Sequence, residues 1–566
     1  MATTLIKPEF TASPSAAKPA ARLWYRTTWF LALASSLALW LPLSPWNVSA
    51  LAWLAPLGWL LLIREEKLSG KWPYAVLYLA GLVHWLLVME GIRRAYWALY
   101  FGWFALAAYL AIYLLLFVGL SRVAVHRLKV PLCLAAPTIW VALELVRGYA
   151  VTGFSMGLLG HTQADLAPLI QISDLGGAYA VSFVVMFVAA CVAQVYPWWF
   201  GRWQRWPAFA LAAMLVAVFG YGYARLSAVD AAQQQDAEPL RITLLQNSVD
   251  TIFGVPMERH AETYRLYQTQ AEDAAKTTPN TQLMVWPESV FTSLYPDYVI
   301  EPDVAPPAGS EWPREEFARY LAAKQAEFAA HVRTSTQRIH RRGGSESHIP
   351  QIVGTLTYHF HADRIEQYNS ALLLSPQGEV LGRYGKMHLV MFGEYIPLGE
   401  TFPWIYQWTP MGGGLSRGKD AAVFEVAGRK LSPSICFEST VPHLIRRQIR
   451  ELEADGTTPD MLVSVTNDGW FWGSGVLDLH YKCAIFRAVE HRKPMLVAAN
   501  TGFSTAVDSA GRVLEVGPRR EVETLQVAVP VSGLASFYTR FGDVFATACL
   551  AFAAVCAGIG LRRSKS

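Results

Sequence analysis

The segment Lys430-Leu-Ser-Pro-Ser-Ile-Cys436-Phe-Glu438 places a cysteine at the end of a short apolar run. Two earlier segments end in a similar way: Val285-Trp-Pro-Glu288 closes on a glutamate, and Gly382-Arg-Tyr-Gly-Lys386 closes on a lysine. A thiol nucleophile, a carboxylate base and a cation are the groups that acyl transfer through a covalent intermediate requires. The three segments predict an α/β domain with an acyl-transferring thiol site where its strands end.

Each of the three side chains has a definite expected role. A strand-to-helix turn at Cys436 would expose the sulfur and direct amide groups towards it. Glu288 could take the thiol proton and later a proton from an attacking amine, and Lys386 could hold the oxyanion of a tetrahedral intermediate. Taken singly, such residues are commonly a capping glutamate, a surface lysine and an inert buried cysteine, and Cys436 could instead pair with Cys483 in a disulfide.

The composition indicates a membrane protein. Of the 566 residues, 53% are hydrophobic and 16% are charged, against about 25% charged residues in soluble proteins. The 21 tryptophans are typical of the aromatic belts at membrane interfaces. No basic tract with interleaved aromatic residues is present, so nucleic acid is not an expected partner. The cysteine and histidine spacings predict no metal site, and nothing indicates an organic cofactor.

Eight apolar runs are long enough to be read as membrane helices, which need about 20 residues each. They lie at roughly 27–45, 47–63, 73–91, 96–120, 130–147, 175–197, 207–226 and 541–561. The stretch between the fifth and sixth runs is half polar and glycine-rich. Such a stretch is tolerated at membrane depth only where protein or water covers it.

The basic residues between these runs predict the orientation, because Lys and Arg accumulate on the cytoplasmic side. With eight spans, one side collects Lys7, Lys18, Arg22, Arg26, Arg64, Lys67, Lys71, Arg122, Arg127, Lys129, Arg202, Arg205, Arg562, Arg563 and Lys565. Both termini are therefore expected inside. The predicted organisation is a cytoplasmic tail at 1–26, a membrane domain of about seven helices at 27–227, an external domain at 228–540 and a last helix with a short tail at 541–566.

Short β-branched runs alternate with longer helical patterns in the external domain, which favours an α/β fold. Strands are expected at 240–245, 283–286, 352–357, 370–374, 431–436, 461–466, 495–499 and 505–508, and helices at about 256–276, 313–340, 440–452 and 478–492. The segment 392–408 is aromatic and broken by prolines. It is either a loop packed on the domain or an arm that dips into the lipid surface and guides an acyl chain.

Trp286-Pro-Glu288, Tyr384-Gly-Lys386 with Phe392-Gly-Glu394, and Ile435-Cys436-Phe-Glu438 resemble the three catalytic blocks of the nitrilase superfamily. The flanking sequences narrow this resemblance to the bacterial apolipoprotein N-acyltransferases. The further segments that carry it are Thr466-Asn467-Asp468-Gly-Trp470-Phe471, Arg487-Ala-Val-Glu490, Ala499-Asn500-Thr-Gly502 and, in the membrane part, Glu144-Leu-Val-Arg147 and Gly160-His-Thr-Gln163. The resemblance covers nearly the whole chain, and the eight-span layout matches it.

This resemblance implies an αββα sandwich for the external domain and an enzyme of the bacterial inner membrane whose catalytic domain is periplasmic. It implies that a phospholipid donates an acyl chain to the α-amine of a diacylglyceryl-cysteine lipoprotein, by a ping-pong reaction through a thioester. The implied roles are general base for Glu288, oxyanion stabiliser for Lys386, acylated nucleophile for Cys436 and supporting positions for Glu394, Glu438, Phe437, Asn467 and Trp470. No cofactor is implied, and a monomer is expected.

The chain departs from the family pattern at a few positions near the expected site. Phe437 stands where tyrosine is usual, Trp472 where glycine is usual, and Leu479 precedes His480 where glutamine is common. These departures leave open an N-acyltransferase of the same build with another amine acceptor. A carbon-nitrogen hydrolase acting as an amidase, or a transporter with an inactive outer domain, are the further alternatives.

Overall fold

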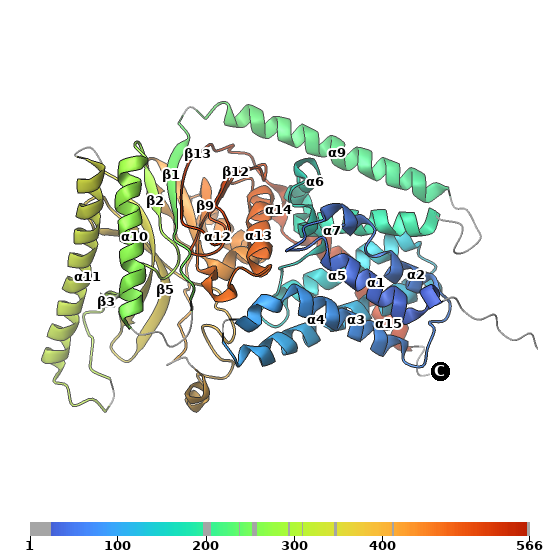
Figure 1. Cartoon of the computed structure of the whole chain (residues 1–566), viewed down its shortest axis with the longest axis horizontal. Coiled ribbons are helices and arrows are strands. Elements are labelled where there is room, and N and C mark those ends of the chain that lie inside the picture. The colour runs from blue at the N-terminus through green and yellow to red at the C-terminus, as the bar shows by residue number, and fades with distance from the viewer. Residues whose placement is uncertain are drawn as a thin grey trace, which may run out of the picture.

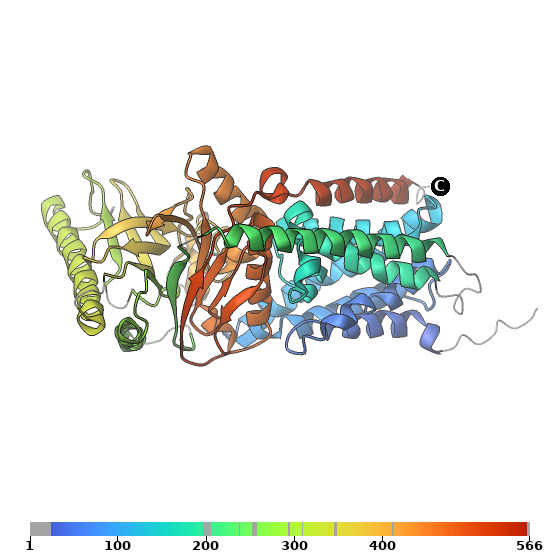
Figure 2. The same ribbon diagram turned by 90° about the horizontal axis from the view of Figure 1, so that it is seen from above.

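The computed structural model describes residues 24–94, 96–195, 205–236, 238–251, 257–292, 295–307, 309–344, 348–409 and 413–562. The molecule is elongated, with a bundle of apolar helices at one end and a domain of sheets and helices at the other (Figures 1 and 2). The first and last described segments both lie at the end of the bundle away from the sheets (Figure 2). The predicted basic residues Lys7, Lys18, Arg22, Arg202, Arg563 and Lys565 lie outside the described residues.

Five helices in the described part are long and apolar enough to cross a membrane. They are α4 (Leu99–Arg122, continued by a π-helical turn to Arg127), α5 (Leu132–Tyr149), α7 (Ser173–Val195), α9 (Trp206–Gln233) and α15 (Val544–Arg562). Three shorter apolar helical segments accompany them: α1 (Thr28–Trp40), the run Ser49–Arg64, which holds η2 (Ser49–Trp53) and α2 (Leu57–Arg64), and α3 (Pro73–Val88).

Several expected spans differ from the observed helices in length or continuity. The run predicted at 47–63 is two helical pieces, because Pro56 stands between η2 and α2 and cannot continue the first of them. With 13 residues, α1 is about 20 Å long at 1.5 Å per residue. The helix predicted at 207–226 instead continues to Gln233, so α9 leads from the bundle to the first strand of the sheet domain (Figure 1).

Two sheets form the core of the other domain. The strands of the first are, in sheet order, β13 (Glu523–Val529), β1 (Leu240–Gln246), β2 (Leu283–Val285), β4 (Gln351–Phe360), β5 (Ile365–Leu374) and β6 (Val380–Gly385), with β3 (Asp297–Ile300) paired to β4. The strands of the second are β12 (Val513–Val516), β11 (Thr505–Val507), β10 (Met495–Ala499), β9 (Met461–Thr466), β8 (Arg429–Ile435) and β7 (Phe424–Val426). The central strands are parallel in both sheets: β1, β2 and β4 in the first, and β8, β9 and β10 in the second.

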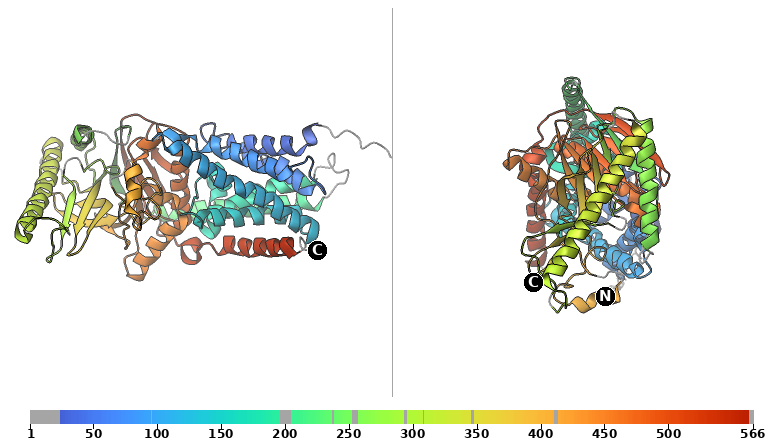
Figure 3. Two further views of the ribbon diagram at one scale, coloured as in Figure 1. Left: turned by 90° about the horizontal axis from the view of Figure 1, so that it is seen from below. Right: turned by 90° about the vertical axis from the view of Figure 1, so that its left-hand side faces the viewer.

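The two sheets share one apolar cluster, in which Ile242 and Val285 of the first lie with Ile435 and Val465 of the second. On the outer face of the first sheet pack α10 (Met257–Thr277) and α11 (Arg314–Gly343). On the outer face of the second pack α12 (Pro442–Ala454) and α13 (Val476–His491), which also contact the helical bundle. Figure 3 shows the resulting order of helices, sheets and bundle along the long axis.

The second sheet is docked on the bundle through buried polar contacts. Arg492, at the end of α13, donates to Asp174 of α7 over 2.7 and 2.9 Å and to the side chain of Gln171 over 2.6 Å. Glu490 of α13 accepts a 2.8 Å hydrogen bond from the amide of Ala178 in α7. Because α13 follows β9 after the 3-10 helix η8 (Asp468–Phe471) and packs on the outer face of the second sheet, these contacts fix where the strand ends meet the membrane helices.

The half-polar stretch between α5 and α7 folds back as short pieces, η5 (Leu159–Gln163) and α6 (Ala167–Ile170). Val151, Thr152 and Gly153 all have positive φ, at 51, 68 and 85°. A Cβ on Gly153 would lie 2.4 Å from the carbonyl oxygen of Gly148, so this reversal requires glycine. The stretch is covered by protein, as expected for an irregular backbone inside a helical bundle.

The aromatic segment 392–408 contains one regular piece, the 3-10 helix η6 (Pro403–Trp408). The rest has no helix or strand, as predicted from its prolines. Phe392, Leu398, Phe402 and Trp404 are all exposed. The exposed side chains favour the interpretation as an arm over that of a loop packed on the domain.

Candidate active site

The candidate nucleophile lies on a tight turn between a strand and a helical piece. Strand β8 ends at Ile435, one residue earlier than predicted, and Cys436 begins the 3-10 helix η7 (Cys436–Thr440). Cys436 has a φ of 53°, a left-handed conformation that is uncommon for a residue with a side chain and that clusters at functional sites. All six cysteines are free, so the alternative of a disulfide between Cys436 and Cys483 is wrong.

A buried carboxylate holds this turn against the segment that carries Lys386. Glu438 accepts hydrogen bonds from the amides of Met387 (2.6 Å) and His388 (2.9 Å) with one oxygen. Its other oxygen accepts from the amide of Ile435 (2.7 Å) and from the hydroxyl of Tyr384 (2.8 Å). Burial raises the pKa of Glu438 to about 7. Glu438 does not line the cavity that contains Cys436, Lys386 and Glu288. It supports the site through its hydrogen bonds to the backbone.

Lys386 and two glutamates form a buried charged cluster. Lys386 follows β6 and is 1% exposed; its Nζ lies 2.8 Å from Glu394 Oε1 and 3.3 Å from Glu288 Oε1. Asn369 of β5 donates to the same two oxygens, over 2.6 Å to Glu288 and 3.0 Å to Glu394. Burial opposes the charge on Lys386, but Glu288, Glu394 and Cys436 raise its pKa well above the ordinary value. Lys386 is therefore a fixed cation.

Glu288 is oriented by donors on both of its oxygens. Besides Asn369 and Lys386 on Oε1, the amide of Asn467 donates to Oε2 over 2.8 Å. Asn467 follows β9, and its side-chain oxygen accepts from Thr251, from the amide of Gly469 and from Asn500. The carboxyl ends of β2 and β9, which belong to different sheets, thus meet at one carboxylate.

A cavity of about 780 Å³ contains these side chains. Its lining includes seven of the eight predicted site residues: Glu288, Lys386, Glu394, Cys436, Phe437, Asn467 and Trp470. Burial, followed by the negative charge of Glu288, raises the pKa of the Cys436 thiol well above its ordinary value, while Lys386 opposes this rise. The thiol is accordingly held protonated until a base accepts its proton.

The opposite wall of the cavity belongs to the membrane helices. Leu99, Gly102, Leu106 and Tyr109 of α4 line it, as does Phe154 of the folded-back stretch. Phe437, at the position where the family usually has tyrosine, stacks on His388 with ring centroids 5.8 Å apart. An apolar wall of membrane helix therefore faces the thiol, the lysine and the glutamates.

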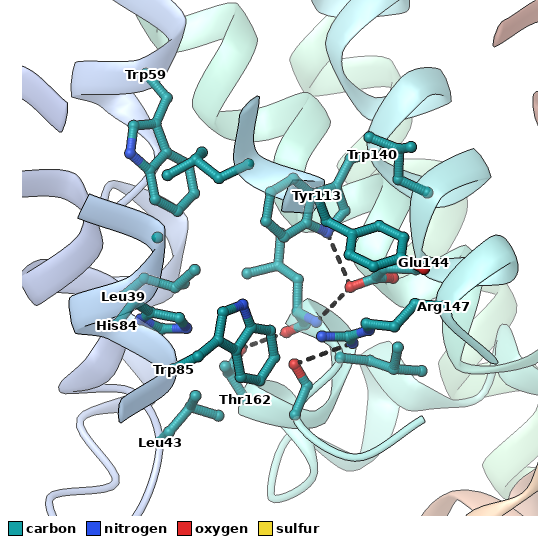
Figure 4. A pocket seen from close by; sticks show the side chains of 16 residues that line it. Leu39, Leu43, Trp59, His84, Trp85, Tyr113, Trp140, Glu144, Arg147 and Thr162 are labelled. Carbon is teal, nitrogen blue, oxygen red and sulfur yellow. Dashed lines mark hydrogen bonds between the residues drawn. The ribbon is translucent and has the colours of Figure 1, made fainter. Parts of the chain in front are cut away.

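A second, smaller cavity of about 50 Å³ lies inside the bundle, where Trp85, Glu144 and Arg147 are among the side chains that line it (Figure 4). Glu144 of α5 reaches it and accepts hydrogen bonds from the indole of Trp140 and the amide of Leu159, each 2.8 Å long. Arg147 lies with its guanidinium 4.9 Å from the ring of Trp85 and 5.9 Å from that of Phe154. These intramembrane charges hold the stretch that forms one wall of the catalytic cavity.

Sequence reasoning gave no role to three residues that the structure places at the site. Asn369 lies within a predicted strand, where a polar residue among apolar ones was the available signal. His480 donates from Nδ1 to Asp468 (3.0 Å) and from Nε2 to the carbonyl oxygen of Cys436 (3.1 Å), and Nε2 also lies 2.8 Å from the Ser439 hydroxyl. Burial opposes its charge, but Asp468 raises the pKa of His480 above the ordinary value. The pair of His480 and Asp468 therefore supports the turn at Cys436 through the hydrogen bond to the Cys436 carbonyl oxygen.

Gly354 of β4 is the third of these residues. A Cβ at this position would lie 2.5 Å from the Cα of Glu288 and 2.5 Å from the carbonyl oxygen of Pro287. No sequence pattern reveals this contact, because the two segments are more than sixty residues apart. The strand passes directly beneath the turn that carries the glutamate, and only a glycine allows this approach.

Two family models match the chain, and together they cover most of it. The model described as "Apolipoprotein N-acyltransferase N-terminal domain" matches residues 35–191, and the one described as "Carbon-nitrogen hydrolase" matches residues 188–538. The sheet domain is thus a carbon-nitrogen hydrolase domain with a nitrilase-type α/β fold, joined to a membrane part.

The curated relatives agree along nearly the whole length. An apolipoprotein N-acyltransferase of Rhodopirellula baltica is 35% identical over 91% of this chain and 94% of its own, and one of Geobacter metallireducens is 30% identical over 95% and 96%. Among solved structures, an amidase from Nesterenkonia sp. is 18% identical, with a TM-score of 0.33 over 51% of this chain and 93% of its own. The chain belongs to the apolipoprotein N-acyltransferase family, and it is an acyltransferase.

Proposed function

We propose that this protein transfers a fatty acyl chain from a phospholipid to the α-amino group of the N-terminal diacylglyceryl-cysteine of lipoproteins. The observation that carries the proposal is the cavity that has Cys436, Lys386 and Glu288 on one wall and α4 on the other. An acyl chain held against α4 would have its ester carbonyl at the thiol while its methylene groups remain in apolar surroundings. The names of the relatives supply the acceptor class.

In the first half-reaction, Glu288 accepts the thiol proton as the Cys436 sulfur forms a bond to the ester carbonyl carbon of the phospholipid. Lys386 stabilises the negative charge that develops on the carbonyl oxygen. When the intermediate collapses, the carbon–oxygen ester bond breaks, the lysophospholipid alkoxide takes the proton from Glu288, and the acyl chain remains as a thioester on Cys436.

In the second half-reaction, the amine nitrogen of the lipoprotein attacks the thioester carbonyl and Glu288 takes a proton from it. The carbon–sulfur bond breaks, the thiolate regains that proton, and the acyl chain leaves as an amide. Glu394 and Asn369 keep Lys386 and Glu288 oriented in both halves, and Glu438 keeps the turn at Cys436 in register with Lys386. Phe437, Trp470 and the loop at Asn467 shape the mouth for donor and acceptor.

We further propose that all eight apolar helical segments cross a bacterial inner membrane and that the enzyme works there as a monomer. The predicted boundaries then stand as a tail at 1–26, a membrane domain at 27–227, a periplasmic αββα domain at 228–540 and a last span from 541. The basic residues Arg64, Arg122 and Arg562 support the cytoplasmic assignment of the end away from the sheets. A reporter enzyme that is active only in the cytoplasm should be active when it is fused after residue 566, and a reporter that is active only in the periplasm should be inactive there. The opposite result would invert the topology.

The test of the chemistry is the intact mass of the purified protein after incubation with a phospholipid. We expect one added acyl group, absent in Cys436→Ala and retained in the matched control Cys483→Ala, whose thiol is buried in the same domain. Adding a diacylglyceryl-cysteine peptide should discharge the adduct. If the adduct forms but the peptide leaves it intact, the acceptor is another amine; if no phospholipid acylates the protein, lipid acyl transfer is wrong.

A further inference from the structure

A cluster of two histidines and two glutamates lies on the first sheet, outside the catalytic cavity. His359 belongs to β4, His361 follows that strand, Glu301 follows β3, and Glu366 belongs to β5. None of the four lines the cavity. Neither the family match nor the proposed reaction gives them a role.

Three of these residues present their ligand atoms to one point. The nitrogens of His359 and His361 and a carboxylate oxygen of Glu301 all lie within 4.8 Å of one another, and no other set of three such side chains does so in the part of the chain that the structure describes. Glu301 Oε1 lies 2.7 Å from His361 Nδ1 and 3.5 Å from His359 Nε2. Ligand atoms of a tetrahedral zinc ion lie about 3.3 Å apart, since zinc–nitrogen and zinc–oxygen bonds measure about 2.0–2.2 Å.

The fourth residue occupies the place of an outer partner of a metal ligand. The second nitrogen of His361, Nε2, lies 2.8 Å from Glu366, which in turn accepts from Arg364 and Tyr368. A histidine that binds a metal with one nitrogen commonly donates from the other to a carboxylate, which fixes its tautomer and ring orientation. Glu301 lies at Nδ1 of His361 and Glu366 lies at Nε2, so His361 has one nitrogen for the ion and one for Glu366.

The scaffold beneath the cluster is regular and holds the ligands in register. His359 pairs with Glu366 across β4 and β5 and with Val299 across β3 and β4. The amide of Glu301 continues the ladder by donating to the carbonyl oxygen of Phe360 over 3.0 Å. Rings of His359 and His361 lie 4.0 Å apart on the same face. His359 lies on β4, and Glu301 and His361 directly follow the ends of β3 and β4. Positions held by paired strands move less than positions on a free loop, which favours a site with fixed geometry.

We propose that Glu301, His359 and His361 bind a divalent transition-metal ion, with Glu366 as the outer hydrogen-bond partner of His361. Zn²⁺ is the ion that fits two imidazoles and a carboxylate with a water as the fourth ligand. Glu301 is 44% and His359 is 30% exposed, so solvent reaches the open position. The ion would join β3, which pairs only with β4, to the hairpin of β4 and β5.

The experiment uses the full-length protein in detergent, stripped with a chelator and titrated with ZnCl₂ against a chromophoric competitor. We expect one Zn²⁺ per chain, at least tenfold weaker binding in His359→Ala and His361→Ala, and a loss of about 10–100-fold in Glu366→Gln. The matched control is His348→Ala, which removes an exposed histidine of the same domain that makes an edge-to-face contact with His340. Its zinc affinity should equal that of the unaltered protein.

Formation of the acyl adduct on Cys436 verifies that each variant is folded, because the cluster is outside the cavity. Co²⁺ provides a second readout, since visible absorption bands from imidazole coordination should be present in the unaltered protein and absent in the double variant His359→Ala/His361→Ala. The proposal is overturned if the unaltered protein does not compete for Zn²⁺, or if the double variant binds Zn²⁺ as tightly as the unaltered protein. Adduct formation without zinc binding would reject the metal site and leave the acyltransferase assignment intact.

Discussion

Cys436 and Glu288 reach the cavity from two sheets, and each depends on a neighbour that makes no contact with substrate. Glu438 is this neighbour for Cys436. It accepts from Ile435 beside Cys436, from the hydroxyl of Tyr384 and from the two amides that follow Lys386, and so it joins η7 to the segment that carries the lysine. Gly354 is this neighbour for Glu288, because its lack of a side chain lets β4 pass close to the backbone of the glutamate. The separation of the three reacting groups is therefore set by backbone contacts.

Gly354→Ala should slow acylation of Cys436 while the protein remains folded. The added methyl group cannot fit at 2.5 Å from the Glu288 Cα, so the glutamate must shift, and a displacement of about 1 Å at a catalytic group can cost about 100-fold in rate. The rate of adduct formation measured by quenched-flow mass analysis tests this. Gly220→Ala in α9, where nothing lies within 4 Å of the new Cβ, should acylate at the normal rate; equal rates for both variants would contradict the expectation.

Glu288, Lys386 and Cys436, the residues of the proposed reaction, could be singled out in the sequence because each ends a short apolar run and because their segments resemble the catalytic blocks of the nitrilase superfamily. The residues that orient them were not predictable in the same way. Asn369 and Gly354 lie inside strands whose partners come from distant segments. The zinc-ligand candidates share this difficulty, since Glu301 follows β3 and His361 follows β4, and these two segments are distant in the sequence.

At the scale of elements, the folded-back stretch between α5 and α7 joins the membrane part to the catalytic cavity. Glu144→Leu would remove the acceptor of the Leu159 amide and of the Trp140 indole inside the bundle. Each buried donor left without a partner costs about 1–3 kcal/mol, so the thermal midpoint in detergent should fall. Glu144→Gln keeps a side-chain oxygen for both donors and should lose much less. A midpoint that is equally low in both variants would show that the charge, and not the acceptor, matters.

The strands and helices of long, periodic segments were predicted within a few residues, as β1, β4, β9, β10, α10 and α13 show. The strands β3, β6, β7, β12 and β13 were not among those predicted. Strands β3, β7 and β12 have three or four residues, which carry too little periodicity, and they are recruited by pairing with a neighbour. Strands β6 and β13 are longer and were missed as well. The membrane helices were predicted by hydropathy, which is insensitive to breaks such as the one at Pro56.

At the scale of the whole molecule, the buried charge pair of Arg492 and Asp174 joins the sheet domain to the bundle. Arg492→Leu would remove two hydrogen bonds to Asp174 Oδ2 and one to Gln171 at a buried site. Arg225 still pairs with Asp174 over 2.9 Å, so we expect a loss at the lower end of the about 3–5 kcal/mol that breaking a buried pair typically costs. The thermal midpoint in detergent should therefore fall strongly. Arg512→Leu is the control, because its pair with Asp230 is more than a third exposed on both sides and should be worth no more than about 1 kcal/mol. Similar losses in the two variants would contradict this account.

Buried Glu490 predicts a pH dependence of stability. Burial raises its pKa to about 7 from an ordinary value of 4.5. Between these values the folded protein holds a proton that the unfolded chain has released, so the unfolding free energy contributed by this group falls as pH rises from about 4.5 to 7 and is constant above. The stability of the unaltered protein relative to Glu490→Gln should therefore fall by about 2–3 kcal/mol between pH 5 and 7. A pH-independent difference would reject the shifted pKa.

The wall of α4 along the catalytic cavity has a kinetic consequence. In the proposed reaction, a phospholipid that reaches Cys436 along α4 comes from the lipid around the protein. The rate of acylation should therefore depend on the surface concentration of this donor in the membrane or micelle, and its bulk concentration should have no separate effect. Adding inert detergent or a non-substrate lipid at constant donor concentration should slow acylation in proportion to the donor's mole fraction, in the manner of surface dilution. The amine acceptor, itself lipid-anchored, is subject to the same dilution, so both half-reactions should respond to the composition of the surface and neither to the volume of the surrounding water.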